Sequence, residues 1–239
     1  MHVISFVTQK GGSGKSTLAI SCAVRATELG QRVLILDMDP QGTAESWYRD
    51  RDAIHPKLAR IHSGQLATAL DGARKQGFNT VIIDTPGRDE PATAAAIRAA
   101  DFVLIPCRPT PGDMKATPPT AATVARLGKK AAFVLSQTPP RGSRLKEAET
   151  GLSMLGMVCP VRIVHRTAYQ DAQGAGLGVT EFEADGKAAR RQRTIEELSS
   201  LRLSVLFRRA ETHAIAQPEV DAVEAEAVDV AGVLVVVHG

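Results

Sequence analysis

One stretch near the start of the chain, Lys10–Thr17 (KGGSGKST), constrains the fold more than any other. It follows the apolar run 3–7 and precedes a segment of helix-forming residues. Glycines in such a loop let backbone N–H groups point at phosphate oxygens, and a lysine neutralises the phosphate charge. The N-terminus of the following helix adds unpaired N–H groups and a positive dipole end. The stretch therefore predicts a strand, a phosphate-binding loop and a helix in succession.

The loop departs from the standard pattern G-x-x-x-x-G-K-[ST] in two places. Gln9 stands where the first glycine is expected, and Lys10 adds a second lysine to a site that one lysine normally serves. By position, Lys15 is expected along the β- and γ-phosphates, and the Ser16 hydroxyl on Mg²⁺. The predicted nucleotide-binding residues of the loop are Gly11, Gly12, Ser13, Gly14, Lys15, Ser16 and Thr17, the last beside the α-phosphate.

Short apolar runs alternate with helix-like segments along most of the chain. This alternation predicts an α/β fold of the P-loop NTPase type, with a mainly parallel twisted sheet and helices on both faces. The expected strands are 2–7, 32–37, 79–84, 101–106, 131–136 and 158–164. The expected helices are 15–29, 64–76, 91–99, 113–127, 143–155 and 187–207.

Three aspartates follow apolar strands, at the edge of the sheet where ligands bind in such folds. Asp84 ends the run 80–84, in the position of a Walker B carboxylate that holds magnesium through a water. Asp37 and Asp39 lie where the run 33–36 leaves into a Pro-Gln-Gly turn. We expect one of these two to support the metal and the other to orient water on the γ-phosphate. The predicted metal site therefore comprises Ser16, Asp37 and Asp84.

Composition sets the remaining limits. A chain of 239 residues with 44% hydrophobic and 23% charged residues is typical of one globular α/β domain, which we place at 1–209. The tail 210–239 is acidic and apolar, without a role that its pattern indicates. Three cysteines without a C-x-x-C pair argue against a disulfide framework or a zinc site and favour a reducing cytoplasm. We expect neither a signal peptide nor a membrane-spanning segment.

Three motifs together, 10–17, 37–42 (DMDPQG) and 82–87 (IIDTPG), resemble the ParA/MinD family of deviant Walker A ATPases in order and spacing. The resemblance covers residues 1–207, and its small size is similar to that of the short, ParF-like partition ATPases (type Ib). It implies that Lys10 is the signature lysine, which reaches the partner's phosphates in a nucleotide-sandwich dimer. It also implies that Asp39 positions water and that 84–87 senses the γ-phosphate. The catalytic residues so implied are Lys10, Lys15, Asp37 and Asp39.

Two later segments resemble nucleotide-bordering parts of this family. The proline-rich loop 105–113 corresponds to one that borders the nucleotide and the dimer interface, and it supplies Pro109. The segment 161–166 corresponds to one beside the base, and it supplies Arg166. The resemblance implies a slow ATPase that uses ATP and Mg²⁺ and is stimulated by a ParB-like or other cargo-adaptor protein. It implies a cytoplasmic, nucleoid-associated homodimer that segregates or positions a plasmid, a chromosome or a protein cluster.

Basic residues suggest a surface for duplex DNA, bound through phosphates without sequence reading. The candidates are Lys187, Arg190, Arg191, Arg193, Arg141 and Arg144. One alternative is a MinD-like ATPase that binds the membrane through the amphipathic segment 198–209, although packing of that segment on the sheet explains the same residues. Another alternative is a metabolic P-loop ligase, for which no second-substrate motif is evident.

Overall fold

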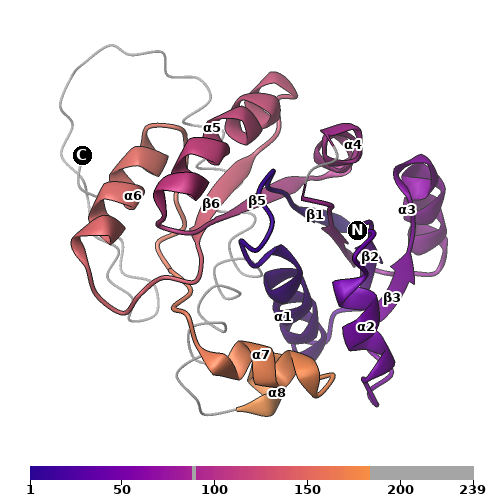
Figure 1. The fold of residues 1–239 in the computed structure, drawn as a ribbon. Helices are drawn as coiled ribbons and strands as arrows, with labels where there is room; N and C mark the ends of the chain where they lie inside the picture. The colour runs from indigo at the N-terminus through magenta and orange to yellow at the C-terminus, as the bar shows by residue number, and fades with distance from the viewer. Residues whose placement is uncertain (88–89, 184–239) are drawn as a thin grey trace, which may run out of the picture.

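A six-stranded sheet forms the centre of the computed structural model, which describes residues 1–87 and 90–183 (Figure 1). The strands are β1 (His2–Phe6), β2 (Val33–Asp37), β3 (Lys57–Arg60), β4 (Thr80–Asp84), β5 (Phe102–Cys107) and β6 (Ala131–Leu135). The helices are α1 (Lys15–Glu28), α2 (Thr43–Arg49), α3 (Leu66–Lys75), α4 (Glu90–Ala99), α5 (Pro111–Arg126), α6 (Ser143–Ser153), α7 (Thr167–Gly174) and α8 (Val179–Phe182), with a 3-10 turn, η1 (Ser63–Gln65), before α3.

The strands run in the order β3-β2-β4-β1-β5-β6, and all five pairings are parallel. Strand β1 therefore lies inside the sheet, between β4 and β5, and its carboxyl end leads into the phosphate loop. The register sets Asp84 beside both Phe6 of β1 and Asp37 of β2. This pairing brings the ends of three strands to one edge of the sheet, where open parallel sheets bind their ligands.

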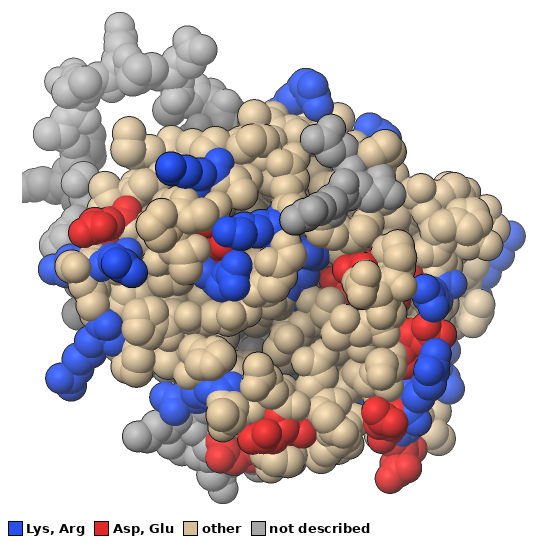
Figure 2. Space-filling model, in the orientation of Figure 1, with Lys and Arg blue, Asp and Glu red and all other residues tan. Residues whose placement is uncertain are grey.

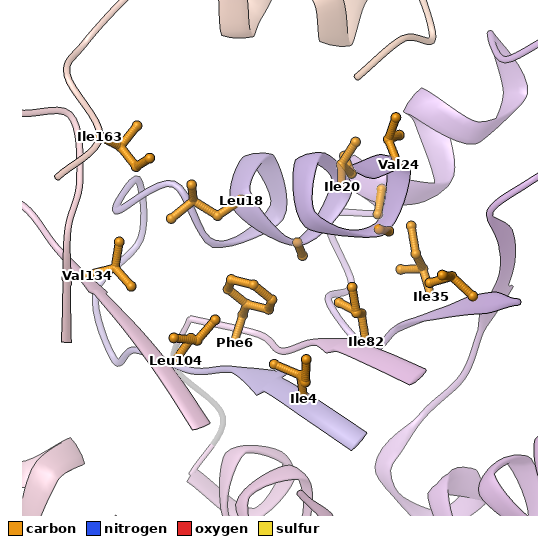
Figure 3. Close-up of a cluster of buried hydrophobic side chains, with 14 of the residues drawn as sticks. Ile4, Phe6, Leu18, Ile20, Val24, Ile35, Ile82, Leu104, Val134 and Ile163 are labelled. Atoms are coloured by element: carbon orange, nitrogen blue, oxygen red, sulfur yellow. The ribbon is translucent and has the colours of Figure 1, made fainter. Parts of the chain in front are cut away.

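Helices cover both faces of the sheet, as the alternating pattern predicts. Helices α1, α2, α7 and α8 contribute buried side chains to one core cluster. Helices α3 and α4 pack on the other face over β2 and β4, and α5 and α6 pack on that face over β5 and β6. Figure 3 shows the first cluster, where Leu18 and Ile20 of α1 lie above Phe6, Ile4 and Ile82 of the sheet. The phosphate loop is thus held between a buried strand and a buried helix.

The fold class and five of the six expected strands are confirmed. The expected strand 158–164 is wrong, because this segment forms only two isolated bridges, from Val158 to Phe133 and from Val164 to Thr138. Pro160 interrupts the segment, and proline has no N–H to donate to a ladder. The sixth strand is instead β3, a short edge strand that ends in Arg60 and carries a weak apolar signal.

Among the expected helices, five are confirmed with bounds shifted by at most a few residues, and α2, α7 and α8 are additional. The expected helix 187–207 and the tail 210–239 lie outside the described residues. Within the described ranges, no helix is both long and apolar enough to span a bilayer.

Candidate nucleotide-binding site

The phosphate loop turns on two glycines whose backbone is in the left-handed region. Gly12 has φ of 75° and Gly14 has φ of 88°, a conformation that costs side-chain-bearing residues energy. Gly14 is also the N-cap of α1, and no side chain caps this helix. The first N–H groups of α1 are therefore left for a ligand, and the helix dipole favours an anion there.

Lys15 is the first residue of α1 and is 6% exposed. Burial lowers the pKa of Lys15, while the nearby carboxylates of Asp84 and Asp39 act in the opposite direction. A lysine buried at the N-terminus of a helix, where the dipole end is also positive, is in an unfavourable place for a cation. The position becomes favourable when an anionic phosphate fills the space between the loop and the helix.

Asp84 is completely buried, and within the described residues neither of its carboxylate oxygens makes a well-aligned hydrogen bond. Burial raises the pKa of Asp84 to about 7; the Ser16 hydroxyl and Lys15 lower it, and Asp37 raises it. A buried carboxylate with so little hydrogen bonding is costly unless a ligand compensates its charge. Together with Ser16, this orphaned group fits a hydrated Mg²⁺, whose usual ligands are oxygens and waters.

Asp37 is also completely buried, but unlike Asp84 it has hydrogen-bond partners within the chain. Its two oxygens accept the backbone N–H groups of Asp39 and Glu45, each at 3.0 Å. Burial raises the pKa of Asp37, and these two hydrogen bonds partly offset that effect. The side chain therefore holds the turn after β2 and the start of α2. Any support that Asp37 gives to a metal comes in addition to this structural role.

Asp39 projects from the turn after β2 and is partly exposed. One of its oxygens accepts the N–H of Gln41 at 3.0 Å, and among the described residues the other accepts no hydrogen bond, so it can contact water. The loop after β4 also approaches the phosphate loop, because a Cβ added at Gly87 would lie 3.6 Å from Lys15 Nζ. Segments that lie far apart in the sequence thus meet at the phosphate loop, as the strand ends predict.

Lys10 lies on the opposite side of the loop and is bound within its own chain. Its Nζ is 3.1 Å from Oδ1 of Asp113, with the lysine side chain 38% exposed and the aspartate 3% exposed. The Arg108 side chain donates two further bonds to Asp113, from Nε at 2.8 Å and from Nη2 at 2.9 Å, and its backbone N–H donates a third at 3.2 Å. Burial by itself would raise the pKa of Asp113, but the bonds from Arg108 and Lys10 outweigh it and hold the pKa at about 2.

Gly112 leaves the room that the Lys10 side chain occupies, because any Cβ at this position would clash with Lys10 Nζ. The neighbouring Pro109 is buried and helps to line a cavity of about 250 Å³ between the start of α5 and α6. The proline-rich loop therefore reaches the phosphate loop through Arg108, Gly112 and Asp113. Sequence reasoning selected Pro109 from this loop and did not assign roles to the other three.

Helix α7 approaches the loop from the other face of the sheet. Thr17 Oγ1 donates to Oε1 of Gln173 at 3.3 Å, so the residue expected near the α-phosphate is tied to α7. Arg166 is the N-cap residue of α7, is partly buried, and has a buried Nε with no hydrogen-bond partner in the described part of the chain. The sequence analysis did not select Gln173. Its role becomes visible only in the tertiary structure, where α7 places its amide beside Thr17.

Of the six residues expected to bind DNA, two are described. Arg141 and Arg144 are exposed, and they lie just before α6 and in its first turn. Figure 2 shows Lys and Arg side chains over the part of the face formed by α5 and α6, whereas Asp and Glu side chains are more frequent over α2, α7 and α8. Lys187, Arg190, Arg191 and Arg193 lie outside the described residues.

Comparison with known proteins relates the chain to a family of nucleotide-binding proteins. A family model described as the CobQ/CobB/MinD/ParA nucleotide binding domain matches residues 4–235. The maintenance of carboxysome distribution protein A of Halothiobacillus neapolitanus is 31% identical over 191 residues, covering 75% of this chain and 87% of that protein. The protein of the same name from Gloeobacter kilaueensis is 32% identical over 208 residues, covering 82% of this chain and 94% of that protein.

The fold is also found among solved structures. The septum site-determining protein MinD of Pyrococcus horikoshii, solved in complex with Mg-ADP, superposes with a TM-score of 0.67 at 15% identity. The match covers 86% of this chain and 98% of that one. At this identity the likeness bears on the fold alone.

Proposed function

Because this chain belongs to the CobQ/CobB/MinD/ParA nucleotide-binding family, we propose that it is an ATPase that positions a cargo in the cell through ATP-dependent dimerisation. ATP closes two copies across their phosphate loops, and the closed dimer binds duplex DNA without sequence preference. Slow hydrolysis, stimulated by a cargo-bound adaptor protein, opens the dimer and releases the DNA. The protein is cytoplasmic and associates with the nucleoid in its ATP state.

The position of Lys10 is the observation that carries this proposal. Lys15 alone fills the place of the phosphate-loop lysine inside the site. Lys10 instead stands at the outer edge of the loop, 38% exposed, and its only described ion pair is to Asp113 of the same chain. A cation held at the rim by a carboxylate can exchange that carboxylate for a phosphate presented from outside. A second copy of the chain presents such a phosphate when two loops face each other.

The other residues divide the chemistry of hydrolysis. The loop N–H groups and Lys15 bind the β- and γ-phosphates, and Asp39 orients the attacking water through its free oxygen. Ser16 and Asp84 would hold a magnesium ion, and Asp37 fixes the turn after β2 through its two backbone hydrogen bonds. The metal, when bound, neutralises charge that develops on the phosphates.

The cargo is proposed from the relatives. Two of them, from Halothiobacillus neapolitanus and Gloeobacter kilaueensis, are named for the distribution of carboxysomes. This chain matches both relatives over most of their length. Their names therefore favour a large protein assembly as its cargo over a plasmid or chromosome. In size, the chain is similar to the short ParF-like partition ATPases. An adaptor that recognises both this ATPase and the assembly is then required.

Capture of the ATP-locked protein tests the cargo. The Asp39→Ala variant should bind ATP and hydrolyse it slowly, so it should accumulate as a dimer and retain its adaptor and DNA in a pull-down. Wild-type protein with ADP is the control and should retain neither. Recovery of a small-molecule product other than ADP and phosphate would contradict the proposal and favour a ligase.

DNA binding is tested separately with random-sequence duplex. The Arg141→Ala/Arg144→Ala and Arg190→Ala/Arg191→Ala/Arg193→Ala variants should each weaken ATP-dependent binding. They should also reduce its salt dependence, by a slope of about 1 for each phosphate interaction that the variant removes. Arg74→Ala/Lys75→Ala on α3 is the matched control, because both residues are exposed on another part of the surface. ATP-dependent sedimentation with anionic liposomes but not with DNA would reverse the assignment in favour of membrane binding.

A further inference from the structure

Two consecutive residues after β6 hold two consecutive carbonyls of the phosphate loop. Ser136 Oγ donates to the carbonyl of Ser13 at 2.7 Å, and Gln137 Nε2 donates to the carbonyl of Gly12 at 2.8 Å. The two pairs are separated by more than 120 residues in sequence. Neither Ser136 nor Gln137 belongs to the motifs that mark the nucleotide site.

The direction of these bonds matters for phosphate binding. In a planar trans peptide the C=O and the following N–H point in opposite directions. When the carbonyl of Gly12 is held toward β6, the N–H of Ser13 is turned away from β6, and the same holds for the N–H of Gly14. Within the described part of the chain, neither N–H donates to a backbone carbonyl. Successive N–H groups turned to one side form the concave anion site of a phosphate loop.

The backbone of Gln137 is distorted in a way that makes this double contact possible. Side chains of neighbouring residues in a strand alternate between opposite faces, so two in succession cannot normally reach one loop. Gln137 has φ of 48°, and among the described residues it is the one non-glycine with positive φ. Such a conformation persists where the surroundings over-determine it, and it is enriched at functional sites.

Backbone hydrogen bonds hold the residues on both sides of Gln137. The N–H of Ser136 donates to the carbonyl of Cys107 on β5 at 2.9 Å, and the N–H of Thr138 donates to Ile163 at 2.9 Å. Ser136 is 1% exposed, so its hydroxyl has no access to solvent as an alternative partner. The Gln137 amide also lies beside Gly14, because a Cβ added there would be in van der Waals contact with its nitrogen at 3.4 Å. The clamp is therefore anchored to β5 and to the segment around Ile163.

We infer that Ser136 and Gln137 are positioning residues that preorganise the phosphate loop by fixing the peptide planes of Gly12 and Ser13. This inference rests on the proposed nucleotide binding and adds residues that act on it without touching the nucleotide. Because the clamp holds the part of the loop that both nucleotides share, its loss weakens ADP and ATP binding by the same factor. Dimerisation at saturating ATP then remains intact.

The test measures the affinity of full-length variants for a fluorescent ADP analogue and a fluorescent, non-hydrolysable ATP analogue. Ser136→Ala and Gln137→Gly should each bind both about tenfold more weakly, the effect expected when a hydrogen bond worth about 1.4 kcal/mol to ligand binding is lost. Ser136→Thr retains the hydroxyl and should restore binding to within about threefold of wild type. Gln137→Glu keeps the shape but replaces the donor by an acceptor, so it should bind at least as weakly as Gln137→Gly.

Thermal unfolding of the nucleotide-free variants separates positioning from a merely structural role. Gln137→Gly removes the backbone strain together with the side chain, so its Tm should stay within about 3 °C of wild type while its affinity falls. Ser153→Ala is the matched control, because the Ser153 hydroxyl donates to the Thr150 carbonyl in α6, away from the loop. The control should leave nucleotide affinity unchanged.

Each outcome is decisive. Equal affinity of wild type, Ser136→Ala and Gln137→Gly for ADP would overturn the clamp while leaving the proposed ATPase intact. Failure of Ser136→Thr to restore binding, or a loss confined to the ATP analogue, would also overturn it. If wild-type protein binds neither nucleotide, the proposed function fails first, and the two failures are thereby distinguished.

Discussion

The two sides of the phosphate loop differ in how far their polar groups are satisfied. On the side of β2 and β4, and counting only partners among residues 1–87 and 90–183, buried Asp84 makes no well-aligned hydrogen bond and one oxygen of Asp39 accepts none. On the side of β5 and β6, Asp113 accepts bonds from Arg108 and Lys10, and the Ser136 and Gln137 side chains bond loop carbonyls. The first side is incomplete until a ligand arrives, whereas the second already holds the loop in shape. The site thus combines buried charges that a ligand would compensate with hydrogen bonds that already hold the loop backbone in place.

The same contrast separates the two lysines of the loop. Lys15 is buried, and burial lowers its pKa, so it lacks full compensation until a phosphate binds. Lys10 is partly exposed and paired with Asp113, so its charge is compensated in the single chain. The difference predicts that removal of each lysine affects a different step.

The largest effect is expected for Lys15→Ala. This change removes the cation that faces the phosphates in a buried site, and it should weaken ATP and ADP binding by about 100-fold or more, in line with the strength of charge-assisted contacts. Isothermal titration at fixed salt provides the measurement. Lys75→Ala on the exposed surface of α3 is the control and should bind normally. Near-normal affinity of Lys15→Ala would contradict the assignment of Lys15 to phosphate binding inside the site.

Asp84→Asn should separate function from stability. Hydrolysis should fall by at least about tenfold because magnesium loses a carboxylate. The nucleotide-free variant should nevertheless be more stable than wild type. In the native state the pKa of Asp84 is raised to about 7, so the folded chain holds a proton that the unfolded chain releases near pH 4.

The sign of this stability difference can be checked by pH. Because folding raises the pKa, the unfolded wild type gains the free energy of ionising Asp84 above pH 4, while the folded wild type stays protonated up to about pH 7. The advantage of Asp84→Asn should therefore grow as pH rises from 4 to 7, by up to about 1.4 kcal/mol per pH unit, and then level off. Urea unfolding of both proteins at pH 5, 6, 7 and 8 measures it. A constant difference across this range would mean that the carboxylate is satisfied in the empty protein.

Lys10→Ala should act at the next step. ADP binding by the single chain should stay within about threefold of wild type, because the pairing of Lys10 with Asp113 places it outside the loop interior. ATP-dependent dimerisation should weaken by about tenfold or more, as expected for loss of a charge-assisted contact between subunits. Sedimentation velocity with ATP and with ADP distinguishes the two. A variant that still dimerises and responds to its adaptor would contradict the assignment of Lys10 to the partner's phosphates.

The smallest effect concerns Asp113 and the stability of the satisfied side. Its pKa is held at about 2 in the folded protein, so its contribution is present above the unfolded value near 4 and is lost as pH falls through about 2. Asp113→Asn should lower the Tm by a few degrees at pH 7, with a smaller difference from wild type at pH 3. Thermal scans at the two pH values provide the test. An equal difference at both would show that packing, and not charge, accounts for the loss.

Much of the site could be predicted from local sequence. The loop glycines, Lys10, Lys15 and Ser16 lie within eight residues, and the strand ends that carry Asp37, Asp39 and Asp84 follow apolar runs without alternation. Parallel strands with short loops place such ends together whatever the spacing in sequence. The expected strand 158–164 was wrong because the prediction relied on its apolar residues. It did not take into account that Pro160 has no N–H to donate to a neighbouring strand.

The sequence by itself determined the α/β class, the loop and the aspartates around it, because each depends on a short pattern of side chains and backbone preferences. Only the tertiary structure decided that Asp113 pairs with Lys10, that Gln173 binds Thr17, and that Ser136 and Gln137 clamp the loop. Aspartate, serine and glutamine residues carry no sequence signal of a partner about 100 residues or more away. Their partners are chosen by how β5, β6 and α7 pack beside β1 and α1, which is a property of the whole sheet.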